Sequence, residues 1–250
     1  MQNAYVISPV LNEAENIPNL VSGWAEIAYN VPGYHFHFLL VDDGSSDGTA
    51  AIAESAAKER NLGLSVLRHE VNRGPGAAFA TGFAYLAGKL SADDVVVTME
   101  GDNTSRVETL KTMFGRMERE GVDVALASPY AHGGGIANTS LYRIVLSHTA
   151  NGIVKALLGI HGVHTMSSFF RAHRGRVILR LQERYGPAIL ACPGFECMIE
   201  LLKKTMLVGA TITEVPMKLD TSLRRGKSKM RTLRTIRGYL RLVLETRRQA

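Results

Sequence analysis

The chain has 250 residues, of which 46% are hydrophobic and 21% charged, a composition that is typical of a folded globular protein and excludes a disordered chain. No run of 18 or more apolar residues occurs, so no membrane-spanning helix is expected; the two cysteines, Cys192 and Cys197, are too few for a disulfide framework and predict reduced thiols in the cytoplasm. The net charge of +6 is concentrated at one end, because residues 216–250 hold eleven Lys or Arg and two acidic residues, whereas residues 1–215 hold 18 basic and 21 acidic residues. The basic end indicates an anionic partner: a membrane surface, phosphate groups or nucleic acid.

Strand and helix patterns alternate strictly over the first 130 residues. Such alternation predicts βαβ units and an α/β fold with a Rossmann-like, mostly parallel sheet flanked by helices. Ligands in these folds bind beyond the carboxyl ends of the strands. The expected strands cover residues 4–10, 35–43, 62–69, 93–99 and 122–129, and the expected helices cover residues 14–28, 45–59, 74–90 and 106–119.

The pattern changes after residue 130, where a glycine-rich connector is followed by an unusually apolar helix. No internal repeat and no low-complexity run is present. The expected elements are the connector over 133–140, helices over 139–158 and 195–207, a short strand within 167–174, a strand over 210–219, a basic loop over 222–231 and a final helix.

Two adjacent carboxylates, Asp42 and Asp43, follow the second expected strand. One interpretation is a capped helix start, in which Ser45, Ser46 and Asp47 satisfy the first N–H groups of the helix. The other is a nucleotide site, because acidic residues at this edge of a sheet accept hydrogen bonds from a base or a ribose. This stretch alone does not decide between the two.

The stretch NRGPGAA, which contains Arg73 and Gly74, leads from the third strand into the next helix. It is similar in outline to loops that cradle phosphates, yet it has neither the GxxxxGK[ST] nor the GxGxxG pattern. Tight packing of a strand against a helix explains the glycines equally well.

In the stretch MEGDNTS, Glu100 and Asp102 stand one residue apart, just past a buried strand. Mg²⁺ and Mn²⁺ prefer carboxylate oxygens together with substrate phosphates and water. Gly101 between the two acids lets both carboxylates face one cation. The alternative is a capped turn at the start of a helix.

The order of these motifs is more specific than any one of them. The stretches SPVLNEAENIPNL, LLVDDGSSDGT, NRGPGAAFATGF and VVTMEGDNTS resemble family 2 glycosyltransferases with the GT-A fold, and in particular the dolichol-phosphate or polyprenyl-phosphate mannosyl- and glucosyltransferases. The resemblance continues through SPYAHGGG, SSFFRAHR, GFECMIELL and RRGKSKM, so it spans nearly the whole chain. It implies a GT-A domain over residues 1–230, with a nucleotide-binding half (1–130) and an acceptor half (131–230), followed by a basic amphipathic helix over 231–250.

The resemblance also implies roles for individual residues. Pro9 and Glu13 match positions that line the nucleotide pocket, and Asp43, together with Asp42, matches the acid that holds the base. Mg²⁺ or Mn²⁺ is the implied cofactor, and the basic loop would meet the diphosphate or the acceptor phosphate. The resemblance implies nucleotide-binding roles for Pro9, Glu13, Asp42, Asp43 and Ser228, metal ligation by Glu100 and Asp102, and catalytic roles for Asp102 and Lys229. The residues themselves add Arg73 and Gly74 of the glycine-rich stretch as nucleotide-binding candidates, and Arg225 and Glu196 as catalytic candidates.

The sequence departs from the family pattern at three places. Glu100 replaces the usual first Asp of the metal motif. Leu223 replaces an Arg that usually stands three residues before the loop glycine, with Arg225 close by. His164 and Ser168 replace the Asp and the Gly of an Asp-Pro-x-Ser-Gly-Phe-Phe pattern. The last departure bears on the donor and the acceptor more than on the fold.

The acceptor decides whether a general base is needed. Cleavage of a sugar nucleotide builds negative charge on the departing diphosphate, which a metal with Arg or Lys stabilises. A hydroxyl acceptor also needs a base close to its proton, for which Glu196 is the candidate. The alternative for Glu196 is a residue in the first turn of a helix, stabilised by the helix dipole. A phosphate acceptor needs no base, because its oxygen is already anionic near neutral pH, with a second pKa of about 6.

The last twenty residues place Leu233, Ile236 and Leu240 at helical spacing among several arginines. A basic amphipathic helix suits an anionic membrane surface, which predicts a peripheral protein at the cytoplasmic membrane face. The alternative is a helix packed on the domain with a solvated basic face. Residues 141–160 are a second candidate for lipid contact, with core or dimer contact as the alternatives. A membrane-anchored subunit or a second copy of the chain would be a further partner.

The resemblance implies metal-dependent, inverting transfer of a hexose from a nucleotide sugar of the GDP-mannose or UDP-glucose type to polyprenyl or dolichyl phosphate. The second hypothesis keeps the enzyme class but makes the acceptor a hydroxyl of a glycan or small molecule. The third is a non-catalytic nucleic-acid-binding module that uses the basic end. The acidic strand ends would repel a phosphate backbone, so no nucleic-acid partner is expected. His161 and His164 lack acidic or Cys partners at zinc spacing, so no zinc site is expected.

Overall fold

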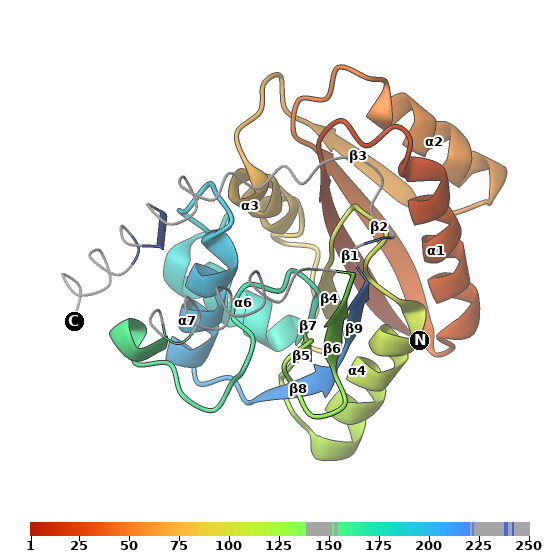
Figure 1. Cartoon of the computed structure of the whole chain (residues 1–250). Coiled ribbons are helices and arrows are strands. Elements are labelled where there is room, and N and C mark those ends of the chain that lie inside the picture. The colour runs from red at the N-terminus through yellow and green to blue at the C-terminus, as the bar shows by residue number, and fades with distance from the viewer. Residues whose placement is uncertain (139–151, 153–154, 221, 223–237, 240–241, 243–250) are drawn as a thin grey trace.

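The computed structural model describes residues 1–138, 152, 155–220, 222, 238–239 and 242 (Figure 1). The described strands form a seven-stranded central sheet in the order β3-β2-β1-β4-β7-β5-β8 and a separate pair, β6-β9. The strands are β1 (Gln2–Val10), β2 (Tyr34–Asp42), β3 (Leu64–Arg68), β4 (Val95–Thr98), β5 (Val124–Ser128), β6 (Gly135–Ala137), β7 (Arg171–Arg174), β8 (Ile212–Pro216) and β9 (Lys218–Asp220). The helices are α1 (Ile17–Asn30), α2 (Thr49–Glu59), α3 (Pro75–Tyr85), α4 (Val107–Glu120), α6 (Gly175–Tyr185) and α7 (Cys197–Leu207).

The central sheet is parallel except at one strand. β1 pairs in parallel with β2 and β4, β2 with β3, and β5 with β8. β7 runs antiparallel between β4 and β5. The mostly parallel α/β fold predicted from the alternating pattern is therefore confirmed, and the carboxyl ends of β1, β2 and β4 share one edge.

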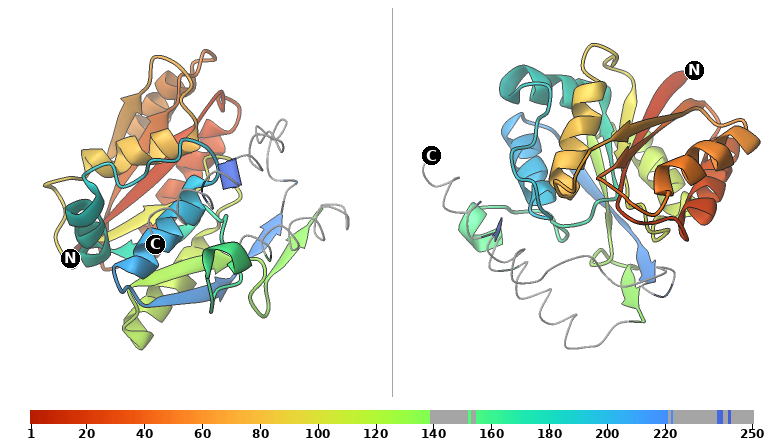
Figure 2. Two further views of the ribbon diagram at one scale, coloured as in Figure 1. Left: turned by 90° about the vertical axis from the view of Figure 1, so that its left-hand side faces the viewer. Right: turned by 90° about the horizontal axis from the view of Figure 1, so that it is seen from above.

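Two layers of helices cover the sheet (Figures 1 and 2). α1, α2 and α4 pack on one face and α3, α6 and α7 on the other, each around its own hydrophobic cluster. The apolar stripe predicted for α1 is buried, and its Trp24 stacks on Phe38 of β2 with ring centroids 4.9 Å apart. Burial of aromatic rings of this size gives each layer a large share of its stability.

Three local features differ from the sequence-based expectations. Helix α6 occupies residues for which no element is predicted above. The expected connector contains β6, which pairs with β9. The strand expected over 210–219 is divided into β8 and β9, because Pro216 has no N–H with which to continue the ladder and the chain changes sheet there.

The C-terminal helix expected over 231–250 lies outside the described residues, apart from Gly238, Tyr239 and Leu242. Leu242 is buried in the same cluster as α3 and α7, and Tyr239 packs against that cluster. Within the described part of the chain, no helix combines the length and the hydrophobicity needed to cross a bilayer.

Asp123, at the start of β5, ties three elements together. Its carboxylate accepts hydrogen bonds from Arg176 Nε at 2.6 Å and from the Thr211 N–H at 3.1 Å. Burial acts to raise the pKa of this carboxyl, but the hydrogen bonds from Arg176 and Thr211 outweigh it and hold the pKa below its usual value. The folded state is therefore stabilised by the ionised form.

We expect Asp123→Asn to lower the free energy of unfolding by about 2 kcal/mol near neutral pH, because hydrogen bonds to a charged group are lost. A carboxyl whose pKa is depressed on folding contributes stability above its unfolded pKa of about 4, and this contribution is lost as the pH falls through the folded value. Urea unfolding should show that the difference in unfolding free energy between the variant and the native protein is constant near neutral pH and becomes smaller in acid. Asp93→Asn, at an exposed aspartate, is the control; a pH-independent difference for Asp123→Asn would contradict the assignment.

Candidate active site

The ends of β1, β2 and β4 bring the predicted nucleotide and metal residues to one edge of the sheet. The register sets Val10 opposite Asp42, and the Asp43 N–H donates to the Val10 carbonyl at 2.9 Å. The Met99 N–H donates to the Ile7 carbonyl at 3.1 Å. The stretch that begins at Met99 therefore leaves β4 directly beside the end of β1.

Gly101 allows this stretch to touch β1. A Cβ at this position would lie 2.6 Å from Val10 Cγ1 and 2.8 Å from the Pro9 carbonyl oxygen, closer than side chains approach one another. Because glycine has no Cβ, the backbone between Glu100 and Asp102 packs on the end of β1. The structure thus places Pro9 next to the two predicted metal ligands.

The carboxylates of Glu100 and Asp102 are held by donors around them. Glu100 is half-buried and accepts hydrogen bonds from Ser105 Oγ at 2.7 Å and from the Phe169 N–H at 3.2 Å. Asp102 is 9% exposed, and its Oδ1 accepts from the N–H and the hydroxyl of Thr104 at 3.2 and 2.6 Å. These bonds close a turn between Asp102 and Thr104, but this turn does not cap α4, which begins at Val107 without a side-chain cap. Burial and the charge of Asp102 raise the pKa of Glu100 above its usual value.

This donor set fits a cation that is shared with a phosphate ligand. Within the described ranges, no group of three or more His, Cys, Asp or Glu side chains is arranged to hold a metal by itself. Mg²⁺ and similar ions at nucleotide sites, however, use one or two carboxylates and take their other ligands from phosphates and water. The repulsion that raises the pKa of Glu100 is what a cation between Glu100 and Asp102 would relieve.

The segment after β1 is fixed on the start of α2. The Asn12 N–H donates to Ser45 Oγ and the Glu13 N–H to Thr49 Oγ1, both at 2.8 Å. The Glu13 carboxylate accepts a hydrogen bond from the side chain of Asn16. Glu13 is thus held in one position at the edge of the sheet, as a residue that lines a pocket would be.

Asp42 and Asp43 are both buried and both bind the backbone of loops at this edge. Asp42 Oδ1 accepts from the Ser45 N–H at 2.9 Å, within the turn that precedes α2, and the first N–H of α2, that of Thr49, donates to Asp47 Oδ1 at 3.1 Å. Asp43 accepts from the N–H groups of Arg73 and Gly74 at 2.9 and 2.8 Å. Asp43 therefore joins the end of β2 to the glycine-rich loop. Contact of either carboxylate with a nucleotide base stays a prediction.

With this geometry in place, comparison with known proteins decides the family. The family model described as "Glycosyl transferase family 2" matches residues 5–177. The chain belongs to glycosyl transferase family 2. It is therefore a glycosyltransferase, and the strand edge described above is its candidate active site.

Two curated relatives cover most of the chain. A protein named polyprenol monophosphomannose synthase, from Mycolicibacterium smegmatis, is 33% identical over 229 residues, which are 92% of this chain and 81% of the relative. A protein named dolichol-phosphate mannosyltransferase, from Pyrococcus furiosus, is 29% identical over 237 residues, which are 94% of this chain and 61% of the relative. The resemblance inferred from the motifs is confirmed.

Solved structures with low sequence identity share the fold. Mannosyl-3-phosphoglycerate synthase from Rubrobacter xylanophilus superposes with a TM-score of 0.65 at 18% identity, covering 100% of this chain and 74% of that one. The mannosyltransferase PcManGT from Pyrobaculum calidifontis, solved in complex with GDP-Man and Mn²⁺, gives a TM-score of 0.58 at 17% identity, covering 94% and 60%. The GT-A fold expected for a family 2 glycosyltransferase is thus confirmed.

In this family 2 glycosyltransferase, the segment before β7 lies at the same sheet edge as Glu100, whose carboxylate accepts from the Phe169 N–H at 3.2 Å. Because β7 is antiparallel, its start lies at the same edge as the end of β4, and Thr98 pairs with Arg171. Thr98 Oγ1 donates to the Phe169 carbonyl at 2.6 Å. The His164 N–H donates to the Glu214 carboxylate at 2.8 Å, so the residue that departs from the family pattern lies in a well-bonded segment.

Arg171 is a site residue that is absent from the predictions above. Its side chain is fully buried and donates to the carbonyls of Met166, Ser168 and Met198 at 2.6 to 2.8 Å. Burial lowers its pKa to about 10, so it stays charged at neutral pH, and the charge of Glu100 acts in the opposite direction. Arg171 therefore joins the segment before β7 to α7, close to the predicted metal ligands. A charged residue directly after Phe-Phe in an expected strand is the signal that could have identified it.

Glu196 immediately precedes α7 and is 8% exposed. It accepts a hydrogen bond from the Gly194 N–H at 3.2 Å. A Cβ on Gly238 would lie 2.5 Å from Glu196 Oε2, so the backbone of Gly238 lies over the carboxylate. Burial and the charge of Glu196 raise the pKa of neighbouring Tyr239 to about 12. The candidate base is thus covered by residues from the C-terminal segment.

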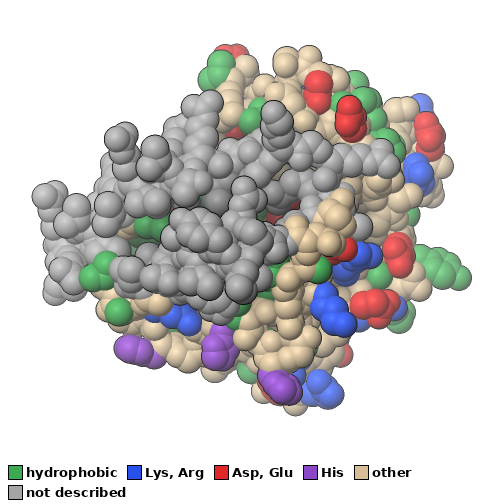
Figure 3. Space-filling view, viewed as in Figure 1, with side chains coloured by type: hydrophobic (Ala, Val, Ile, Leu, Met, Phe, Trp, Pro, Cys, Tyr) green, Lys and Arg blue, Asp and Glu red, His purple; other side chains and the backbone are tan. Residues whose placement is uncertain are grey.

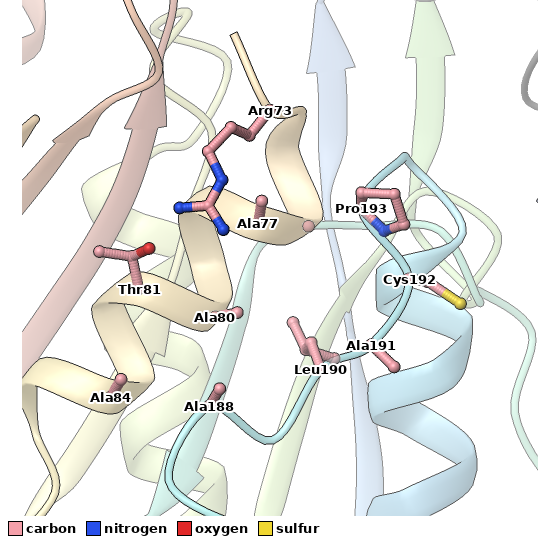
Figure 4. A pocket seen from close by; sticks show the side chains of 11 residues that line it. Arg73, Ala77, Ala80, Thr81, Ala84, Ala188, Leu190, Ala191, Cys192 and Pro193 are labelled. Carbon is pink, nitrogen blue, oxygen red and sulfur yellow. The ribbon is translucent and has the colours of Figure 1, made fainter. Parts of the chain in front are cut away.

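A cavity of about 360 Å³ lies between α3 and the loop that precedes α7 (Figure 4). Small side chains of α3, Ala77, Ala80 and Ala84, face Leu190 across it. The side chain of Arg73 extends along α3 beside this cavity. Arg73 therefore meets the strand edge through its backbone N–H, which binds Asp43, while its side chain follows α3.

Three predicted residues of the basic loop, Arg225, Ser228 and Lys229, lie outside the described residues. Their contacts with a diphosphate or with an acceptor phosphate stay predictions.

Proposed function

We propose that this glycosyltransferase moves a hexosyl group from a nucleotide sugar of the GDP-mannose or UDP-glucose type to the phosphate of a polyprenyl or dolichyl lipid, with inversion at the anomeric carbon and with Mg²⁺ or Mn²⁺. The observation that carries the proposal is the placement of Glu100 and Asp102 beside Pro9, at the carboxyl edge of a family 2 sheet. The names of the two curated relatives support a lipid phosphate as the acceptor.

The reaction is a single displacement. An oxygen of the acceptor phosphate forms a bond to C1 of the sugar as the bond from C1 to the diphosphate oxygen breaks, and the nucleoside diphosphate leaves with the electron pair. Glu100 and Asp102 would hold the cation, which supplies positive charge against the departing diphosphate. Residues 9–13 and the Asp42–Asp43 pair would hold the nucleoside.

The position of Glu196 favours a phosphate acceptor over a hydroxyl acceptor. A general base must come within hydrogen-bond distance of the proton it removes. The Glu196 carboxylate is instead covered by Gly238 and bonded to Gly194. A phosphate oxygen is already anionic near neutral pH and reacts without such a base.

A matched pair of acceptors tests this function. The purified full chain is incubated with Mn²⁺ and either GDP-mannose or UDP-glucose, together with detergent-dispersed polyprenyl phosphate or the corresponding polyprenol. The two lipids share one tail and differ only in the phosphate. We expect mass spectrometry to show a hexosyl phosphodiester with the phosphate lipid and no glycoside with the alcohol. Equal transfer to the alcohol would support the hydroxyl hypothesis, and no transfer to either lipid would reject the proposed acceptor.

The face shown in Figure 3 bears on the nucleic-acid hypothesis. Lys and Arg side chains of the described residues lie there among Asp and Glu side chains. A nucleic-acid site needs basic residues gathered into a patch that follows the phosphate backbone. The described surface on this face therefore offers no such patch, while the basic end on which the nucleic-acid hypothesis rests lies outside the described residues.

We further propose that residues 231–250 hold the enzyme at the cytoplasmic face of an anionic membrane, since the basic charge of the chain is concentrated there. An exposed Lys or Arg near such a surface contributes about 1 kcal/mol. Because Leu242 packs into the core, the test changes charge and leaves the apolar residues in place. Sedimentation with anionic vesicles should fall strongly when four arginines are replaced by Gln, with neutral vesicles as the control, and unchanged sedimentation would contradict the proposal. The arginines are Arg231, Arg234, Arg237 and Arg241.

A further inference from the structure

A buried histidine completes the hydrogen bonds around Asp43. His69 Nδ1 lies 2.7 Å from Asp43 Oδ1, the oxygen that also accepts from the Arg73 N–H. Its other ring nitrogen, Nε2, lies 2.8 Å from Thr81 Oγ1 on α3. The side chains of His69 and Asp43 are 4% and 5% exposed. Because a carboxylate accepts hydrogen bonds, Nδ1 is the donor to Asp43, and Nε2 is hydrogen-bonded to the Thr81 hydroxyl.

The loop that Asp43 binds has two further contacts of its own: the Gly74 N–H also donates to Asn72 Oδ1 at 3.0 Å, and the backbone of Val71 and Asn72 packs on Gly44. Residues 70–73 are exposed, and Gly74 has a φ of +96°, a conformation that an L side chain rarely adopts. Directly after this loop, the Gly76 N–H donates to the Pro193 carbonyl at 2.8 Å. Pro193 lies three residues before Glu196, so the shape of the loop also affects how the start of α3 contacts the loop that leads to Glu196.

We propose that His69 is a positioning residue for donor binding: it orients the Asp43 carboxylate, which shapes the Arg73–Gly74 backbone that faces the donor diphosphate. Two loop N–H groups bind different oxygens of Asp43, so the plane of the carboxylate sets the path of the loop. The terminal torsion angle of an Asp side chain has a broad distribution, and a hydrogen-bond donor held against one carboxylate oxygen restricts that angle. Thr81 in turn restricts the imidazole ring. This inference rests on the proposed function, because it takes a nucleoside diphosphate sugar as the ligand.

Two substitutions separate the contacts of the ring. The amide nitrogen of an Asn side chain comes close to the position of Nδ1, whereas that of a Gln side chain comes close to Nε2. His69→Asn therefore keeps the hydrogen bond to Asp43, and His69→Gln keeps the contact with Thr81 and loses Asp43. The measurements are donor affinity by calorimetry and the separate kcat and KM for the donor.

His69→Gln should weaken donor binding and raise KM about tenfold, because a hydrogen bond to a charged group is lost, with a smaller effect on kcat. His69→Asn should stay within about twofold of the native protein. In a double-mutant cycle, the variant with both His69→Gln and Asp43→Asn should bind the donor only slightly more weakly than Asp43→Asn alone, because both residues act through one hydrogen-bond network. Native donor affinity in folded His69→Gln protein would overturn the proposal, since a purely structural role lowers stability and leaves binding unchanged.

The same variants show whether the Asp43 carboxylate contacts the nucleotide base directly. If Asp43 acts through the loop, each of Asp43→Asn and His69→Gln lowers the affinity for GDP-sugars and for UDP-sugars by the same factor. A change in the preference between the two bases that occurs in Asp43→Asn alone would show a base contact that does not depend on His69, and would overturn the positioning role of His69.

Amide hydrogen exchange needs no nucleotide and separates this inference from the proposed function. His69→Gln should speed exchange at the Arg73 amide, whose acceptor Asp43 is then no longer fixed, and less at the Gly74 amide, which also donates to Asn72 Oδ1; His69→Asn should leave both unchanged. If native protein binds no nucleotide sugar while exchange changes in this way, the proposed function fails and the positioning of the loop stands. Unchanged exchange in both variants would overturn the positioning itself.

Discussion

Asp102→Asn is expected to abolish the Mn²⁺-dependent increase in melting temperature that a donor sugar nucleotide produces, and to lower kcat/KM by on the order of 100-fold or more. The amide keeps an oxygen that can accept from the N–H and the hydroxyl of Thr104, so the turn and the fold survive. On the proposed function, the substitution removes one of the two carboxylates that would hold the cation, and the better metal ligand of the pair. The departing diphosphate is then left with little compensating charge.

The chain offers a close internal control for this substitution. Asp47 Oδ1 accepts from the N–H and the hydroxyl of Thr49 at 3.1 and 2.5 Å, the same local pattern that Asp102 makes with Thr104. Asp47→Asn therefore removes the same charge from the same kind of turn, at a residue with no proposed contact to metal or substrate. We expect it to keep the Mn²⁺-dependent shift, measured with GDP- and UDP-sugars with and without the metal. If Asp102→Asn keeps the shift as well, the cation is bound elsewhere.

The alternating half of the fold is predictable from sequence because its signals are local. The apolar stripe of α1 and the runs of Val and Leu in the strands can be read within a few residues, and parallel pairing then follows from the βαβ order. Helix α6 is predictable in the same way, since Val177, Ile178 and Leu181 stand at helical spacing and are buried, although it is absent from the elements predicted above.

The small second sheet is a different case. β6 and β9 have three residues each, and Gly135 pairs with Lys218 across more than eighty residues of chain. Neither segment has a period of its own, because each strand exists only through its partner. Sequence patterns of short range contain no information on such a pairing.

The candidate site divides along the same line. The edge that carries Glu13, Asp42 and Asp102 follows from the rule that ligands bind beyond the carboxyl ends of parallel strands. The contacts that position these residues do not follow from it, because they join distant segments. Arg171 is satisfied by carbonyls on two separate segments, and His69 links the end of β2 to α3. Local chemistry indicates where a site lies, and tertiary contacts decide how rigidly it is held.

Gly76→Ala is expected to lower both stability and activity, because no space exists for a methyl group at this position. Gly76 is buried in the first turn of α3, and a Cβ there would overlap the Cys192 carbonyl oxygen and lie 2.8 Å from Cys197 Cβ. The methyl group would push α3 away from the loop before α7 and weaken the hydrogen bond from Gly76 to Pro193. Overpacking of this kind costs about 1–3 kcal/mol. The activity loss should exceed that of an equally destabilising change elsewhere. The reason is that the Arg73–Gly74 loop before α3 and the loop before α7 that leads to Glu196 meet at this contact.

Gly115→Ala provides the matched comparison for that substitution. Gly115 lies within α4, and a Cβ there meets nothing within 4 Å. Replacing glycine by alanine in an open helical position stabilises a protein by up to about 1 kcal/mol, so this variant should melt at a higher temperature and keep its activity. Urea unfolding and kcat/KM, measured on both variants, give the contrast. Because the two changes add the same methyl group to two helices of one protein, a Gly76→Ala enzyme as stable and active as Gly115→Ala would mean that α3 and the loop before α7 are further apart than the structure places them.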